Sequence, residues 1–533
     1  MAVFLFVLAL LVDFALGGCA TRSTPSGGPR DTTAPRVDTS FPANGSLNFE
    51  GNEISIEFNE YISLKSPREQ ISFSPPLNEK PEFELRGKEL TIRWQDTLLE
   101  NTTYTISFGE AITDFTEGNV NGQIKFVFST GDYLDSLRFS GRVIDSRTAQ
   151  PEKEMLVALY DLSSLKQDDS VMFKTMPAYY TYTDENGNFN LENLKYGSFH
   201  LIAFNDKRGN FRLNTGTEKI AFLSDSLVLS DSTEAVELHS FMPKPEKRFF
   251  GARHSGNGQL EIAFSYTPDS VKIRPLYPDS TDAVDFIVWD ENRDTATYWF
   301  EQSDRDSIVI VVEAAPKIAD TSVVFLRPFK EKKLELAPVN SEIAFYTDPE
   351  ILGNRPLTTI DPKKIWLYTP KDTSALDSFY LVDPLRFALI LPKKPKEFSL
   401  YFMAGALKSF DGKVNDSLIL EFKTLRRDEL GSLLFGVAAD TNQARVLVFN
   451  DENGEYERKR SFKGTVSLEL ANEKPGMYQA YLIMDRNEDG SWTTGDYFLR
   501  RQPEEIIRYG EPIEIRANWE LELLWDLSGE QND

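Results

Sequence analysis

The residues best suited to chemistry lie in one short stretch near the C-terminal end of the sequence. Between positions 485 and 496, oxygen-bearing side chains occupy the first, third, fifth and twelfth places of a loop, with glycine in the sixth place; they are Asp485, Asn487, Asp489 and Asp496. Calcium takes about six to eight hard oxygen ligands, and the glycine permits the sharp turn that brings them together. The alternative is an Asx-rich turn, whose side chains accept hydrogen bonds from the loop's own amides and bind no cation. The sequence therefore predicts either a single Ca2+ site or a bare turn, directly after an apolar strand.

Residue types that act as nucleophiles or bases are few. The chain of 533 residues has one cysteine and three histidines, and none of them stands in a recognisable nucleophile motif. His200 lies in the alternating run 199–203 and is predicted to face outward from a strand. Because the chain has 83 acidic residues, carboxylate pairs arise by chance and single out no glycosidase site. We therefore expect a protein that is not an enzyme and requires no cofactor, with Ca2+ as the one ion that the sequence suggests.

The single cysteine, Cys19, ends an apolar N-terminal run. Residues 2–16 are nearly all apolar, which is the length of a secretory signal and too short to span a bilayer. The run ends in Leu-Gly-Gly-Cys, which resembles the bacterial lipobox. That resemblance implies removal of residues 1–18 and a diacylglyceryl group on the thiol of Cys19. Residues 19–35 are rich in Ser, Thr, Gly and Pro, so they are predicted to form a flexible tether.

The net charge of the chain excludes some classes of binding partner. The formal net charge is −25, so both nucleic acid and an anionic membrane surface would repel the protein. We expect no nucleic-acid partner and a strongly hydrated exterior.

The body of the chain is predicted to be all-β. Apolar and polar residues alternate with a period of two in many short runs, which is typical of half-buried strands; examples are 54–58, 90–94, 104–108, 308–312, 387–391 and 418–422. Turn dipeptides such as Asn-Gly and Asp-Gly separate these runs. The pattern predicts tandem antiparallel β-sandwich domains in an elongated, multidomain arrangement.

A long-range duplication organises the chain. Residues 107–130 resemble residues 401–424, with Ala111 matching Ala406 and Phe128 matching Phe422. A second kind of segment follows each copy. We therefore divide the body into five modules: module A at 36–132, module B at 133–243, a β-rich middle module at 244–336, module A′ at 337–427 and module B′ at 428–529.

The residues between Asp31 and Gly131 resemble the bacterial Ig-like domain found in S-layer-type proteins. The resemblance rests on Asp31-Thr-Thr-Ala-Pro35, Ile56-Glu-Phe58-Asn-Glu60-Tyr61, Asn101-Thr-Thr-Tyr104 and Phe128-Ser-Thr130-Gly. Module B, with Thr183-Asp-Glu-Asn-Gly187-Asn-Phe189, resembles the transthyretin-like regulatory domain of carboxypeptidases. The whole arrangement, including the stretch from Asp485 to Gly495, is similar to the Ig-like-domain lipoproteins of the Bacteroidota.

That resemblance implies a lipid-anchored protein of the outer membrane with a binding or scaffolding role and no catalytic residues. We expect it on the cell surface rather than the periplasmic face. Because rigid tandem sandwiches present extended surfaces and sheet edges, we expect an accessory subunit in assembly or export, with outer-membrane β-barrel or other envelope proteins as partners. The alternative is a surface adhesin or glycan-binding lipoprotein. Two groups of aromatic residues could stack on sugars, or could instead pack in the core or between modules: Trp289, Tyr298, Trp299 and Phe300, and likewise Trp519 and Trp525.

Overall fold

The computed structural model describes most of the chain from position 31 onward, and its elements are almost all strands. The described residues are 31–163, 174–214, 217–276, 286–290, 292–301, 305–315, 318–330, 332–391, 394–439, 442–454 and 456–527. Cys19, the signal segment and most of the tether lie outside them. Among the described residues, no helix is long and apolar enough to cross a membrane. Single helical turns occur between strands at α2 (Pro67–Gln70), η2 (Pro362–Lys364) and η3 (Arg427–Glu429).

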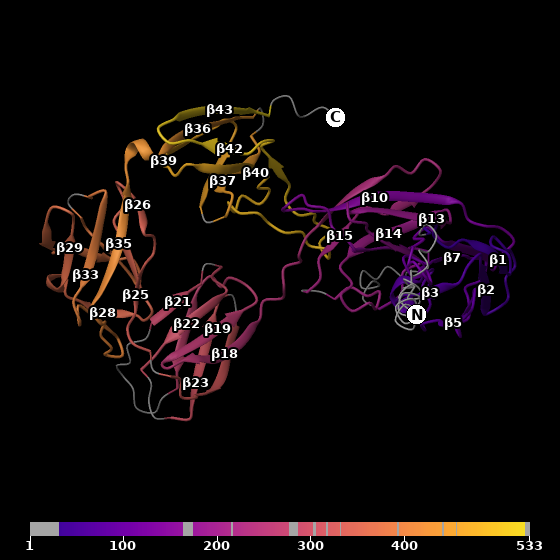
Figure 1. Cartoon of the computed structure of the whole chain (residues 1–533), viewed down its shortest axis with the longest axis horizontal. Helices are drawn as coiled ribbons and strands as arrows, with labels where there is room; N and C mark the ends of the chain where they lie inside the picture. Colours follow the sequence, from indigo (N-terminus) through magenta and orange to yellow (C-terminus); the bar gives the residue numbers. More distant parts are fainter. Residues whose placement is uncertain are drawn as a thin grey trace, which may run out of the picture.

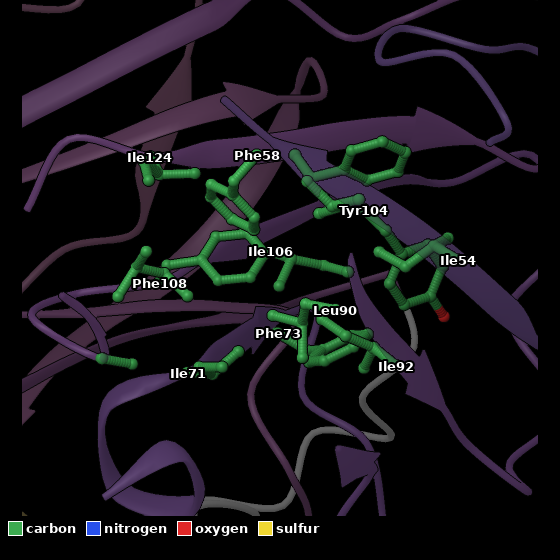
Figure 2. Packing of buried hydrophobic residues seen from close by; sticks show 14 of the residues in the cluster. Ile54, Phe58, Ile71, Phe73, Leu90, Ile92, Tyr104, Ile106, Phe108 and Ile124 are labelled. Carbon is green, nitrogen blue, oxygen red and sulfur yellow. The ribbon is translucent and has the colours of Figure 1, made fainter. Parts of the chain in front are cut away.

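Module A packs two larger sheets face to face. Along one strand Ile54, Ile56 and Phe58 are fully buried while the residues between them point outward, so the period-two pattern decides which face enters the core. Figure 2 shows Ile54 and Phe58 in one cluster with Tyr104 of the opposite sheet and with Phe108, which directly follows the same strand. The sheets are β1 (Val37–Phe41)-β2 (Glu53–Phe58)-β6 (Glu89–Arg93)-β5 (Glu82–Arg86), β4 (Ser72–Ser74)-β7 (Thr103–Ser107)-β9 (Lys125–Ser129), and the pair β3 (Ile62–Leu64)-β8 (Ile112–Asp114).

Module B is a second sandwich. In its smaller sheet the pair β10–β17 is parallel, and the other pairs are antiparallel. Its strands are β13 (Asn188–Leu194)-β10 (Leu137–Asp145)-β17 (Val236–Ser240) in one sheet, and β12 (Tyr179–Tyr182)-β11 (Leu156–Asp161)-β14 (Gly197–Phe204)-β15 (Ile220–Phe222) with β16 (Leu227–Leu229) in the other.

The middle module forms a sandwich with its own core. Tyr298 and Phe300 are buried in this core, whereas Trp299 is buried against module A′, where its ring meets Phe410 with centroids 5.8 Å apart. Its sheets are β18 (Phe249–Gly256)-β19 (Gln259–Phe264)-β22 (Thr295–Trp299)-β21 (Phe286–Trp289) and β20 (Val271–Pro275)-β23 (Ser307–Ala314)-β24 (Ile318–Phe325).

Module B′ repeats the strand order of module B, and module A′ repeats that of module A with one added strand at each edge of its second sheet. In B′ the pair β36–β43 is parallel, as β10–β17 is in B. Module A′ contains β25 (Leu336–Pro338)-β27 (Glu350–Gly353)-β32 (Arg386–Leu389)-β31 (Phe379–Leu381), β26 (Glu342–Ala344)-β35 (Leu418–Leu425)-β33 (Glu397–Phe402)-β29 (Ile365–Tyr368)-β30 (Thr373–Ala375) and β28 (Leu357–Ile360)-β34 (Leu407–Ser409). Module B′ contains β39 (Val466–Glu473)-β36 (Gly431–Ala438)-β43 (Glu520–Asp526) and β38 (Glu457–Lys463)-β37 (Ala444–Asp451)-β40 (Gly476–Ile483)-β41 (Ile506–Arg508) with β42 (Ile513–Ile515).

The row of sandwiches bends so that its last member meets its second. Following the colours of Figure 1 from indigo to yellow, the chain passes through A and B on the right, the middle module below, A′ on the left and B′ above. There B′ contacts B, because the connection from β40 to β41 reaches across to β14 and β15. The fold is thus all-β and built from tandem sandwiches, as predicted, with one contact between modules that are distant in sequence.

Candidate functional site

The connection between β40 and β41, residues 484–505, carries the four predicted calcium ligands and also makes the contact with module B. We call it the docking loop. Asp485, at its start, is buried, and its two carboxylate oxygens accept hydrogen bonds from backbone amides. Oδ1 accepts from Asp489 N at 3.1 Å, and Oδ2 accepts from Gly490 N at 2.9 Å. Gly490 has φ +76°, a left-handed conformation that glycine adopts without strain.

The next two predicted ligands continue this turn. Asn487 Nδ2 donates to Asp489 Oδ2 and to Thr493 Oγ1, both at 2.8 Å. Asp489 Oδ1 accepts from Ser491 N at 2.8 Å. These contacts are those of an Asx-rich turn, and a carboxylate that caps an amide keeps further lone pairs for a cation.

Asp496 belongs to the following turn. Its Oδ1 accepts from Leu499 N at 3.1 Å, and its backbone pairs with Arg501. Over the described part of the chain, no group of three or more His, Cys, Asp or Glu residues is arranged to hold a metal ion. Calcium binding by Asp485, Asn487, Asp489 and Asp496 stays a prediction.

A buried glutamate that the sequence did not single out closes the docking loop. Glu504 Oε1 accepts from Arg486 N at 2.7 Å, and Glu504 Oε2 accepts from Thr493 N at 2.8 Å. The carbonyl oxygen of Glu504 also accepts from Trp492 Nε1 at 2.8 Å. Buried carboxylates must be hydrogen-bonded, and here the partners are amides at both ends of the turn. Nothing in the charged run RRQPEE distinguishes this residue from Glu505.

The outer side of the docking loop presents Tyr497 to module B. The Tyr497 hydroxyl lies 2.7 Å from His200 Nε2, and Arg500 Nη1 lies 3.1 Å from the same nitrogen. The Arg500 guanidinium sits over the Tyr497 ring, with its central carbon 5.2 Å from the ring centroid. His200 is therefore only 6% exposed, although it points away from the core of module B. Strand alternation places His200 on the face of β14 opposite Phe199 and Leu201, but the expectation of an outward-facing side chain is wrong, because module B′ buries that position.

Small and polar residues of the docking loop allow it to approach module B closely. A Cβ atom on Gly495 would lie 2.5 Å from ring carbons of Phe241, so only glycine fits there. Thr494 Oγ1 donates to Met242 O at 2.8 Å. Gln502 Nε2 donates to Phe222 O at 2.9 Å. The loop thus forms polar bonds around an apolar contact.

The apolar contact joins the interiors of the two modules. Tyr497 belongs to a buried cluster of module B that includes Ile202 and Phe222, and Trp492 packs against that cluster and against Val446 of module B′. The Tyr497 and Phe222 rings meet edge to face, with centroids 5.2 Å apart. Burial is the main cause that raises the pKa of the Tyr160 hydroxyl in this cluster, and Tyr497 contributes to the shift. The arrangement fixes two domains against each other in a water-poor interface.

Comparison with known protein families assigns one segment of the chain to a family. Residues 31–130, about a fifth of the chain, match the family described as bacterial Ig-like domain. Module A is therefore a bacterial Ig-like domain, as its motifs predicted. A search of curated proteins found no match.

Several solved structures of tandem domains resemble the chain at low identity. The N-terminal part of the bacterial S-layer protein SbsC is 9% identical with a TM-score of 0.15, and the match covers 55% of this chain and 44% of that one. BcpA, the major pilin subunit of Bacillus cereus, is 9% identical with a TM-score of 0.15, covering 73% of this chain and 99% of that one. Titin domains A168-A170 are 12% identical with a TM-score of 0.14, covering 52% and 98%. At these TM-scores the likeness says nothing about function.

Proposed function

We propose that the protein is an outer-membrane lipoprotein with a structural, interaction role. It serves as an accessory subunit of an outer-membrane protein complex, for example one that assembles or exports β-barrel proteins. Cys19 carries the lipid anchor, and the folded modules face the cell surface. Its partners are β-barrel or other envelope proteins, and neither an enzymatic reaction nor nucleic acid is involved.

The contact between modules B and B′ is the observation that carries this proposal. Flexible linkers would let neighbouring sandwiches sample many orientations, which would not present one continuous surface to a partner. The buried Tyr497 and the hydrogen bonds of Thr494 and Gln502 hold two distant modules together. A preorganised body on a tether suits a subunit that bridges other proteins, because less order is lost on binding.

One exposed tryptophan favours the second candidate, a surface adhesin or glycan-binding lipoprotein. Trp519 is exposed on module B′, with Arg516 over its ring at 5.3 Å from the centroid. An exposed indole ring offers a flat apolar face on which a sugar can stack. The buried Trp299 and Trp525 do not offer such a face.

Affinity purification from detergent-solubilised outer membranes tests the proposal. The tagged full chain should co-purify β-barrel proteins in stoichiometric amounts, and Tyr497→Ala should lower their recovery by loosening the body. A matched control is Tyr368→Ala, because Tyr368 is exposed on module A′. Glycan-array binding that depends on Trp519, with no protein partner recovered, would favour the second candidate instead.

A further inference from the structure

A cleft opens beside the docking loop, where the chain leaves module B for the middle module. Its volume is about 680 Å3, within the range of about 300–1,000 Å3 that is usual for ligand sites. Its walls come from four parts of the chain: module B, the linker 243–248, residues 495–501 of the docking loop, and Phe250 and Ser265 of the middle module. We call it the junction cleft, and it exists only while B and B′ are in contact.

The junction cleft has an apolar floor and apolar rims. Ile220 and Tyr497 are buried beneath it, while Phe250 and Phe498 are 68% and 58% exposed at its sides. Two large aromatic side chains left in water beside one cleft are costly to maintain, and exposed apolar groups gathered around a concavity typically mark a binding site. The floor and rims therefore suit a large apolar side chain.

The charge of the junction cleft is opposite to that of the protein. The chain carries a net charge of −25, yet the cleft lining has three cationic residues, Lys244, Arg248 and Arg501, against two acidic ones, Glu246 and Asp496, so its net charge is positive. Arg248 pairs with Glu246. In the described residues, neither Lys244 nor Arg501 forms an ion pair, so both ammonium and guanidinium groups are available to an incoming carboxylate.

The linker that walls the cleft offers backbone groups as well. Residues 243–245 are in no helix or strand, and their backbone forms no hydrogen bond with another described residue. Pro243 and Pro245 lack an amide hydrogen, so the segment presents carbonyl oxygens and the single amide of Lys244. Unpaired backbone next to apolar pockets is the feature by which extended peptides are recognised.

We propose that the junction cleft binds an extended segment of a partner protein that carries an aromatic or large aliphatic side chain beside a carboxylate. The apolar side chain lies between Phe250 and Phe498, and the carboxylate meets Lys244 or Arg501. This inference rests on the proposed function in that the partner is a protein.

Fluorescence anisotropy with the full chain in lipid nanodiscs tests the site. The probe is a fluorescein-labelled peptide in which phenylalanine and glutamate alternate. Phe250→Ala and Arg501→Glu should each weaken binding by about tenfold or more, and a peptide with lysine in place of glutamate should bind at least tenfold more weakly. Matched controls are Phe325→Ala and Lys272→Glu, which alter an equally exposed aromatic residue and an exposed lysine on the middle module. These controls should bind as the wild type does.

Three results would overturn the site. The first is equal peptide affinity in the wild type and both cleft variants. The second is a dimer, detected by light scattering, that Phe250→Ala abolishes, since a second copy would then fill the cleft. The third is binding of a fluorescent fatty acid that depends on both residues when the peptide does not bind.

Affinity purification with the same variants separates this inference from the proposed function. Loss of envelope proteins from both cleft variants, but not from the controls, supports the junction cleft. Unchanged recovery with the cleft variants overturns the cleft and leaves the accessory role standing. If wild type recovers no envelope protein while the peptide still binds as expected, the proposed outer-membrane partner is wrong and the peptide site holds.

Discussion

The hydroxyl of Tyr497 in module B′ lies 2.7 Å from Nε2 of His200 in module B, although 297 positions separate the two residues along the chain. The hydrogen bond thus joins modules B and B′, which the middle module and module A′ separate along the chain. Both residues are buried, and Arg500 Nη1 lies 3.1 Å from the same nitrogen, so loss of the Tyr497 hydroxyl removes one of the polar contacts that His200 makes across the module boundary.

Substitution of Tyr497 should release module B′ from module B. Tyr497→Ala removes a buried aromatic ring, which costs about 3–5 kcal/mol, whereas Tyr497→Phe removes one hydrogen bond and costs about 0.5–1.5 kcal/mol. Small-angle scattering should show a larger radius of gyration for the alanine variant and little change for the phenylalanine variant. The exposed Tyr368→Ala serves as control, and equal radii for all four proteins would contradict the role of Tyr497.

Substitutions at Gly495 and Phe241 should have coupled, non-additive effects on stability. Gly495→Ala places a methyl group where ring carbons of Phe241 lie 2.5 Å away, so the ring or the loop must move. We expect the alanine variant to weaken the contact by about 1–3 kcal/mol, the usual cost of overpacking, and Phe241→Leu to restore part of it. Gly510→Ala is the matched control, because a Cβ there meets nothing within 4 Å. Additive effects in the double variant, measured by thermal unfolding, would rule out the steric explanation.

Acid should weaken the contact between modules A and B. Glu192 Oε2 of module B lies 2.5 Å from Lys125 Nζ of module A, and this hydrogen bond holds the pKa of Glu192 below its ordinary value of 4.5. A lowered folded-state pKa means that the pair adds stability above about pH 4.5 and loses it as the pH falls further.

A comparison of wild type with Glu192→Gln across that pH range provides the measurement. The variant should unfold more readily near neutral pH, and the difference should shrink as the pH falls from about 4.5 toward 3. The exposed Glu50→Gln should show no such convergence. A constant gap between wild type and Glu192→Gln at every pH would indicate that the ion pair is irrelevant.

Calcium should stabilise the docking loop if Asp485, Asn487, Asp489 and Asp496 act as ligands. At a hundredfold excess over the dissociation constant, binding to the folded state alone adds about 2.7 kcal/mol. Hydrogen exchange of the full chain should then slow across residues 485–496 on adding calcium, with module A unchanged, and Asp489→Ala should remove the effect. If the hydrogen-exchange rates of residues 485–496 are identical in calcium and in chelator, the loop is an Asx-rich turn that binds no calcium.

Lipidation at Cys19 should anchor the protein. Cys19→Ser should leave an unprocessed precursor or a protein that no longer partitions into detergent, because the thiol is the acceptor of the diacylglyceryl group in the lipobox resemblance. Detergent-phase partitioning of the two proteins checks this directly, and equal partitioning would refute the anchor. Protease treatment of intact cells then reports whether the modules face the surface.

The local alternation of apolar and polar residues was enough to predict the strands and which of their faces are buried. The alternation of Ile54, Ile56 and Phe58 predicts one buried face of a strand, because successive side chains point to opposite sides of a sheet. The match of residues 107–130 with 401–424 likewise anticipated that modules A and A′ share their strand order. Both inferences depend on residues close in sequence or on direct comparison of two segments.

The docking loop shows what such patterns leave out. Its chemistry suggested a cation site, and the carboxylate of Asp485 proved to cap two amides in a turn that carries Tyr497 outward. Glu504, which closes the turn, looks like any surface glutamate in the sequence, because its burial depends on the fold of residues 485–503 around it.

The sequence by itself determined that this protein is a chain of β-sandwiches, that module A is a bacterial Ig-like domain, and that His200 lies on the strand face opposite Phe199 and Leu201. Only the tertiary structure decided that His200 is buried. Strand alternation is a local property, set by the pleat of one sheet, whereas the approach of Tyr497 depends on the paths of all the modules between them.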